Sequence, residues 1–259
     1  MKKQLLAGII ALSTIALVYT SCKKTSTDPS TKTLDSKTVT QEIALNLAQT
    51  FYGGLGGFDF SDGLHPQINA VRPGFKKIVI NTVNPECGLK LDTTLSYSVS
   101  IDTAQLSISG RFKFATICIN NNVSGLTFYD SLLVSMITPS LTAKYRIGQD
   151  LAITSLSPSN PDSEISFGGT MNMQTDLEFK TGAKPKASTA FYYKLTSLII
   201  DPTDDGQIKG GSAVFKTTGS TPRGKWEYTG TILFMGDNKV KITINGATYT
   251  VDIQTGQIV

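Results

Sequence analysis

The sequence predicts a mainly β fold: a large curled antiparallel β-meander (half-barrel, barrel or sandwich) with one N-terminal amphipathic helix. Two observations carry most of this prediction. Beyond the apolar N-terminus, only residues 38–52 repeat apolar side chains at helical spacing, whereas from Lys76 onward apolar and polar residues alternate with a period of two. Turn-forming pairs separate the alternating segments, and Asn245-Gly246 is the strongest hairpin signal among them.

The first 21 residues have the features of an export signal. Lys2 and Lys3 supply positive charge, and residues 5–18 form an apolar run. That run is about 14 residues long, whereas a membrane-spanning helix needs about 20, so an uncleaved anchor is the weaker interpretation. A simple secreted protein would have small residues one and three positions before the cleavage site, and Tyr19 does not fit that pattern.

Cys22 follows the small hydroxyl pair Thr20-Ser21 directly after the apolar run. This arrangement resembles the lipobox of bacterial lipoproteins, in the looser form of Bacteroidota lipoproteins, although Tyr19 replaces the usual aliphatic residue. The resemblance implies that a signal peptide, residues 1–21, is removed and that Cys22 carries palmitate or similar acyl chains. It also implies a flexible tether at residues 22–37. Two or more acyl chains hold a protein stably at a membrane.

In bacterial lipoproteins, the residues that follow the lipidated cysteine indicate in which membrane, and on which face, the protein is held. Inner-membrane retention usually requires aspartate at the next position, where this chain has Lys23. Surface display is often signalled by an acidic cluster, and Lys23-Lys24 has the opposite charge. We therefore expect a lipid-anchored protein of the outer membrane, with the periplasmic face slightly favoured over the cell surface.

Composition narrows the function classes. The formal net charge of +4 includes two lysines of the export signal, and the chain has no basic block, so nucleic-acid binding is not expected. His65 is the single histidine, and no nucleophile motif accompanies it. The acidic stretch 201–206 fits an ordinary turn better than a calcium loop. We therefore expect no enzyme, no cofactor and no metal site.

Cys87 and Cys118 are the only pair of cysteines that remains once Cys22 carries lipid. The cell envelope permits thiol oxidation, so we expect a disulfide between them. The alternative is two free buried thiols. A metal site would need more ligands than these two thiols and His65 provide.

The expected helix covers residues 38–52. Thr38, with Gln41 three residues later, forms a capping-box pattern, and Gly53-Gly54 ends the helix. A single apolar stripe runs along it, formed by Val39, Ile43, Leu47 and Phe51 with Ala44 and Ala48 beside them. Such a stripe needs an apolar surface to pack against.

The expected strands are alternating segments at 77–83, 95–101, 106–120, 126–137, 141–147, 151–156, 164–180 and 187–200, followed by a strand near Ile208 and a three-stranded C-terminal meander. The stretch Gly148-Gln149-Asp150 is expected to turn between two of them. Gly168-Gly169 is expected to bend the longest segment. A bulge at Gly210-Gly211 would bring Ile208 and Phe215, which fall on opposite parities, to one face.

These strands would make a flat sheet more than about 50 Å wide, whereas a helix of about 15 residues is only about 22 Å long. The sheet must therefore curl, fold over itself, or leave apolar surface for a ligand or partner. The candidate apolar-ligand face comprises Phe167, Met171, Met173, Phe191 and Tyr193. Core packing is the alternative role for the same side chains.

The whole mature chain resembles uncharacterised Bacteroidota lipoproteins in two stretches, residues 84–88 and 241–252. Its order of elements also resembles the half-barrel carriers of lipids and lipoproteins in the bacterial envelope. We expect residues 38–259 to form a single domain with a non-catalytic structural or accessory role, docking to another envelope protein through a sheet edge or face. The alternative is a carrier of a lipid or another apolar ligand.

Overall fold

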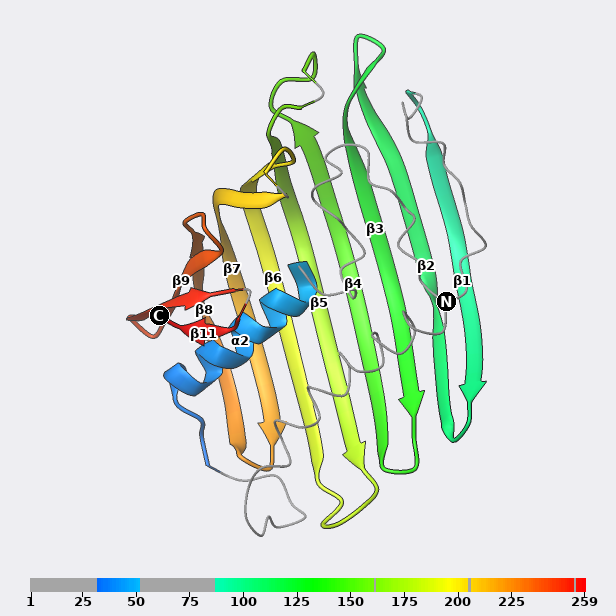
Figure 1. Ribbon diagram of the computed structural model, residues 1–259, viewed down its shortest axis with the longest axis vertical. Coiled ribbons are helices and arrows are strands. Elements are labelled where there is room, and N and C mark those ends of the chain that lie inside the picture. Colours follow the sequence, from blue (N-terminus) through cyan, green and yellow to red (C-terminus); the bar gives the residue numbers. More distant parts are fainter. Residues whose placement is uncertain (1–31, 52–86, 161, 205, 254) are drawn as a thin grey trace.

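The computed structural model describes residues 32–51, 87–160, 162–204, 206–253 and 255–259. Within these ranges the chain forms one antiparallel sheet of eleven strands, and each strand pairs with its neighbours in the sequence (Figure 1). Strands β1 and β11 lie at the two edges, so the sheet does not close on itself. The expected antiparallel meander is confirmed, in an open and curled form.

One helix, α2 (Ser36–Phe51), precedes the sheet in the described part of the chain. The strands are β1 (Lys90–Ile101), β2 (Ala104–Ile119), β3 (Asn122–Ile137), β4 (Leu141–Ser155), β5 (Ile165–Phe179), β6 (Lys186–Asp201), β7 (Gln207–Thr221), β8 (Gly224–Phe234), β9 (Lys239–Ile244), β10 (Ala247–Asp252) and β11 (Gln257–Ile258). The first eight are much longer than the five or six residues of an ordinary strand, so the sheet is tall as well as wide.

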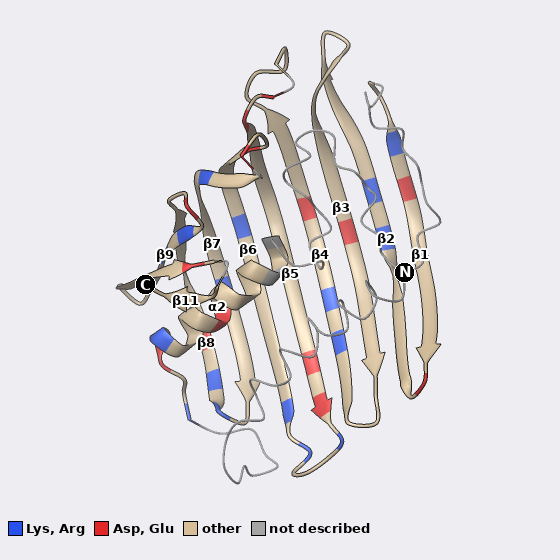
Figure 2. Ribbon diagram, in the orientation of Figure 1, with Lys and Arg blue, Asp and Glu red and all other residues tan. Residues whose placement is uncertain are grey.

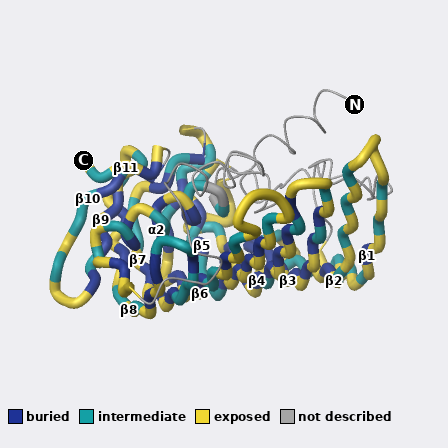
Figure 3. Tube along the Cα trace, turned by 90° about the horizontal axis from the view of Figure 1, so that it is seen from below, coloured by how far each residue is buried: buried dark blue, intermediate teal, exposed yellow. Residues whose placement is uncertain are grey.

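The sheet curls around the helix at one end only. Strands β8–β11 rise beside α2 and enclose it, whereas β1–β4 extend away as a single layer of described residues (Figure 3). We call the face against which α2 packs the inner face, and the opposite face the outer face. Along each strand, buried side chains at inner positions alternate with exposed ones at outer positions, as expected for a sheet with one wet face.

Helix α2 begins with a different cap from the one that the sequence pattern indicates. The Asp35 carboxylate accepts a hydrogen bond from the Thr38 N–H at 2.8 Å, so Asp35 is the N-cap and the assignment to Thr38 is wrong. This hydrogen bond lowers the pKa of Asp35 below its usual value. The expected apolar stripe is confirmed for Val39, Ile43 and Leu47, which are fully buried.

The expected turn at residues 148–150 is wrong, because the chain runs straight through it as the middle of β4. Gly148 and Asp150 take outer positions and pair with both neighbouring strands, while Gln149 takes an inner position and is buried. The alternation of inner and outer positions therefore continues through these three residues. The two strands expected at 141–147 and 151–156 form one strand, β4. The strand expected at residues 77–83 lies outside the described residues.

The irregularities expected at the paired glycines are both present. The register between β5 and β6 shifts between Phe167 and Gly169, near Ser197, a non-glycine residue with a φ of 47°. Further shifts between β6 and β7 bring both Ile208 and Phe215 to the inner face, where their side chains are buried.

Gly169 is required by a close approach of two strands. Its φ is 130°, and a Cβ atom there would lie 2.1 Å from the Asp150 carbonyl oxygen on β4. We expect Gly169→Ala to lower the free energy of unfolding by about 2 kcal/mol or more, measured by urea denaturation. Gly168→Ala is the matched control, because its Cβ would be 3.6 Å from the nearest atom. Equal stabilities of the two variants would contradict this explanation.

Candidate functional site

The candidate apolar-ligand face predicted from the sequence lies on two neighbouring strands. Phe167, Met171 and Met173 belong to β5, and Phe191 and Tyr193 to β6. All five take inner positions and are at most 9% exposed. Met171 faces Tyr193 across the ladder, and the rings of Phe191 and Tyr193 stack with their centroids 6.4 Å apart. The structure therefore brings the five residues together on the inner face.

Helix α2 covers this face and contacts it through polar groups. The Tyr193 hydroxyl donates a hydrogen bond to the Asn46 side-chain oxygen at 2.9 Å, and the Asn46 amide donates to the Met173 sulfur at 3.8 Å. Burial raises the pKa of Tyr193 well above its usual value, so its hydroxyl keeps its proton. The space left beneath the helix here is about 10 Å³, room for about one water molecule. In the described part of the chain, this face is packed as core.

A second polar contact joins α2 to the turn between β7 and β8. The Arg223 guanidinium donates to the Glu42 carboxylate at 2.6 Å, and the Glu42 side chain is only 15% exposed. Burial raises the pKa of Glu42, and the positive charge of Arg223 opposes that shift only in part. The pair is therefore largely desolvated, and removing one partner would leave the other charge poorly compensated.

The raised pKa of Glu42 predicts a pH dependence of stability. A carboxyl group whose pKa is higher in the folded chain than in the unfolded chain stabilises the fold most at low pH. That contribution is lost as the pH rises through the folded-state pKa. We expect the free energy of unfolding of the wild type to fall relative to Glu42→Gln between about pH 4 and pH 7, measured by urea denaturation. A difference that stays constant or grows with pH would contradict this assignment.

The residues before α2 lie along the start of β8. Thr33 forms a parallel bridge with Lys225, and the Leu34 N–H donates to the Lys225 carbonyl at 2.9 Å. The Tyr228 hydroxyl donates to the Leu34 carbonyl at 2.7 Å. The chain therefore enters the helix from a fixed position on the sheet, which sets the direction in which α2 crosses it.

Several buried polar side chains interrupt the inner face, among them an aspartate and a glutamine that sequence reasoning missed. Asp130 on β3 and Gln149 on β4 face each other across the ladder and are at most 4% exposed. Phe112 on β2 and Met171 on β5 flank this pair. The signal was present, because Asp130 stands in the apolar register of residues 126–136. A carboxyl group buried among apolar side chains is costly, which makes Asp130 a candidate functional group.

Cys87 and Cys118 form a disulfide in the structure, as the sequence predicts, with their Cα atoms 5.7 Å apart. Cys87 lies just before β1, and Cys118 lies near the end of β2. A tight turn closes the other end of this hairpin, at residues 102–103. The edge hairpin of the sheet is therefore held at both ends.

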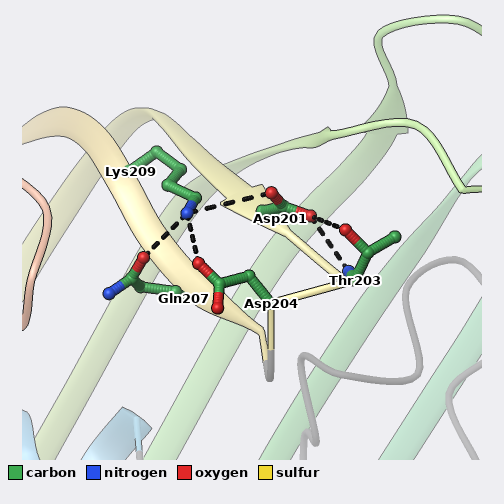
Figure 4. Close-up of polar contacts among 5 residues, drawn as sticks. All are labelled: Asp201, Thr203, Asp204, Gln207 and Lys209. Carbon is green, nitrogen blue, oxygen red and sulfur yellow. Dashed lines mark hydrogen bonds and ion pairs between the residues drawn. The ribbon is translucent and has the colours of Figure 1, made fainter.

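The side chain of a lysine on β7 lies among the acidic residues of the turn between β6 and β7. Figure 4 shows the Lys209 ammonium group among Asp201, Asp204 and Gln207. It lies 3.8 Å from the Asp201 carboxylate and donates hydrogen bonds to Asp204 and Gln207. A hydrogen bond from the Thr203 side chain is the main cause that lowers the pKa of Asp201. The positive charge of Lys209 thus lies beside the carboxylates of Asp201 and Asp204. The described residues contain no group of three or more potential metal ligands.

The remaining charges are dispersed over the outer face. Figure 2 shows both signs scattered along the strands. Several oppositely charged neighbours form exposed ion pairs: Arg111 with Asp92, Arg146 with Asp176, Lys186 with Glu178 and Lys216 with Glu227. Cys22 and His65 lie outside the described residues.

No protein-family model matches the chain. No curated protein sequence matches it significantly. No solved structure does so either. In the ranges that the structure describes, no helix is both long and apolar enough to span a membrane.

Proposed function

We propose that this protein is a non-catalytic accessory lipoprotein of the bacterial outer membrane, anchored through Cys22, which docks to another envelope protein through the edge of β1. The lipid anchor rests on the sequence around Cys22. The observation that carries the docking is the open sheet, which ends in a twelve-residue edge strand. An unpaired strand edge is a template for pairing with a strand of another chain.

Strand β1 has few of the devices that protect an edge. It pairs with β2 along its whole length without a bulge, and it contains no proline. Its one lysine, Lys90, stands at the start of the strand. Natural sheets block exposed edges with prolines, bulges or lysines. Since none of the described residues pairs with the second side of β1, this edge suits a strand from a partner.

The ladder indicates which backbone groups of β1 a partner would reach. The Thr116 N–H donates to the Leu89 carbonyl at 3.0 Å, and Lys90 faces Ala115 in the next pair. Hydrogen-bonded and non-hydrogen-bonded pairs alternate along an antiparallel ladder. Counting from Lys90, the N–H of Ser98 therefore points away from β2, toward the edge.

We expect Ser98→Pro to abolish docking and to keep the fold, because proline removes an edge donor but no bond to β2. The measurement is crosslinking from a photoreactive residue at position 96, next to this donor, in the bacterium that makes the protein. The adduct is identified by mass spectrometry. Circular dichroism of the purified variant checks that the sheet is intact.

The matched control is Ser98→Ala, which keeps the N–H and should crosslink like the wild type. A photoreactive residue in place of Lys241, on the exposed side of β9, measures the background. Docking through the β1 edge is contradicted if Ser98→Pro and Ser98→Ala give equal adducts. It is also contradicted if both probe positions give the same adducts.

A second candidate function is the carriage of a lipid or another apolar ligand. A second apolar cluster, separate from the core under α2, favours it. This cluster includes Leu95, Leu132, Val134, Tyr145 and Ile147 on the inner face of β1, β3 and β4, and it contains no residue of α2. All five side chains are at most 7% exposed, so the cluster is a second buried apolar layer, and a carrier holds an apolar ligand within a layer of this kind.

Native mass spectrometry of the Cys22→Ala protein separates the two functions. If the protein is a docking accessory, we expect an empty monomer whose mass is the same before and after organic extraction. A lipid mass that co-purifies and disappears on extraction would support the carrier and contradict the purely accessory role.

A further inference from the structure

The outer face carries a hollow of about 600 Å³ over β3, β4 and β5, on the side of the sheet that α2 does not touch. Its centre is a row of three residues that face one another across the ladders, Ser131, Gly148 and Asn172. The central residue of the row has no side chain, and the Asn172 amide lies 2.7 Å from where its Cβ would stand, so the floor of the hollow is formed by this amide and the backbone of β4. This is the stretch that sequence reasoning took for a turn.

The side chains around this floor are mostly exposed and chemically mixed. They are Tyr129 and Leu133 on β3, Arg146 and Asp150 on β4, Thr170 on β5, and Ser109 on β2. Tyr129 is 38% exposed and Leu133 is 42% exposed, so two apolar side chains stand at the edge of a polar hollow. They are four residues apart on one strand, which places their Cα atoms about 13 Å apart.

The charges of the hollow are balanced. Arg146 is already paired with Asp176, with 2.7 Å between nitrogen and oxygen. Of the two aspartates in the lining, Asp130 is buried and only Asp150 is exposed. The Lys113 ammonium, 5.4 Å from the centroid of the Tyr129 ring, adds a positive charge at the edge of the hollow. A polyanion such as a nucleic acid would therefore find no surplus of positive charge here. A wholly apolar ligand would leave the amide and hydroxyl groups of the lining without partners.

We propose that this hollow binds a neutral oligosaccharide. Sugar hydroxyl groups both donate and accept hydrogen bonds, and the lining offers both kinds of partner: the Asn172 amide, the Asp150 carboxylate and the Ser131 hydroxyl. The C–H faces of sugar rings pack on aromatic and aliphatic side chains such as Tyr129 and Leu133. The span between these two side chains suits several linked sugars better than one.

The dimensions agree with this assignment. Small-molecule sites commonly have volumes of about 300–1,000 Å³, and the hollow falls within that range. It is broad and open, so the ligand stays largely hydrated and its affinity is modest, in the high-micromolar to millimolar range. The site depends neither on the lipid anchor nor on the β1 edge, because its residues lie on β2–β5.

The test uses the purified full chain carrying Cys22→Ala. Isothermal titration calorimetry is performed with hexasaccharides of α-linked glucose, β-linked glucose, xylose, mannose and N-acetylglucosamine. We expect at least one of them to bind. Gly148→Leu should weaken that binding at least about tenfold. The added leucine side chain fills the floor of the hollow and displaces the Asn172 amide, which lies 2.7 Å from where a Cβ at position 148 would stand.

Thr229→Leu is the matched control, because it adds the same side chain to an exposed outer position on β8, away from the hollow. It should bind like the parent protein. Tyr129→Ala and Asp150→Ala test the lining without filling the floor, and they decide the result if circular dichroism shows that Gly148→Leu is unfolded. The inference is overturned if none of the five sugars binds, or if the folded hollow variants bind as tightly as Thr229→Leu.

Discussion

The structure depends on one constraint: a very large antiparallel sheet has to keep a single apolar face away from water. Among the described elements only α2 lies on that face, and it is too short to cover eleven strands. The last strands of the sheet, β8–β11, curl around the helix and bury more of this face (Figure 3). Burial of apolar surface drives this arrangement, and the long ladders of backbone hydrogen bonds carry it across the sheet.

Apolar packing alone would let the helix slide or rotate on such a surface. Three polar contacts define one position instead: Asn46 with Tyr193, Glu42 with Arg223, and Ser36 with Tyr249 at 2.7 Å. Their partners lie on β6, in the β7–β8 turn and on β10. The three contacts therefore connect both the flat and the curled parts of the sheet to helix α2. Each is costly to leave unsatisfied when buried, which favours this placement over its neighbours.

Much of the fold could be predicted from the sequence, because strand alternation and the helical stripe are local patterns. The errors were also local. Asp35 and Thr38 can both cap a helix, and only the observed hydrogen bond decides between them. The glycine at position 148 suggested a turn, yet it lies within a continuous strand and lines the outer hollow. The pairing of Asn46 with Tyr193 joins residues 147 positions apart, and no sequence pattern specifies the register and curl that bring them together.

The contacts of α2 also have a consequence for the order of folding. The helix is made early, but Glu42 needs a partner 181 residues later and Ser36 needs one 213 residues later. Contacts this distant in the chain slow folding, because long loops must close before any energy is gained. Until the C-terminal strands have formed, the apolar stripe of α2 and the apolar inner face of the first strands stay exposed to water. Exposed apolar surfaces of this kind aggregate readily. A chain built in this way would gain from a holding chaperone until its C-terminal strands have formed.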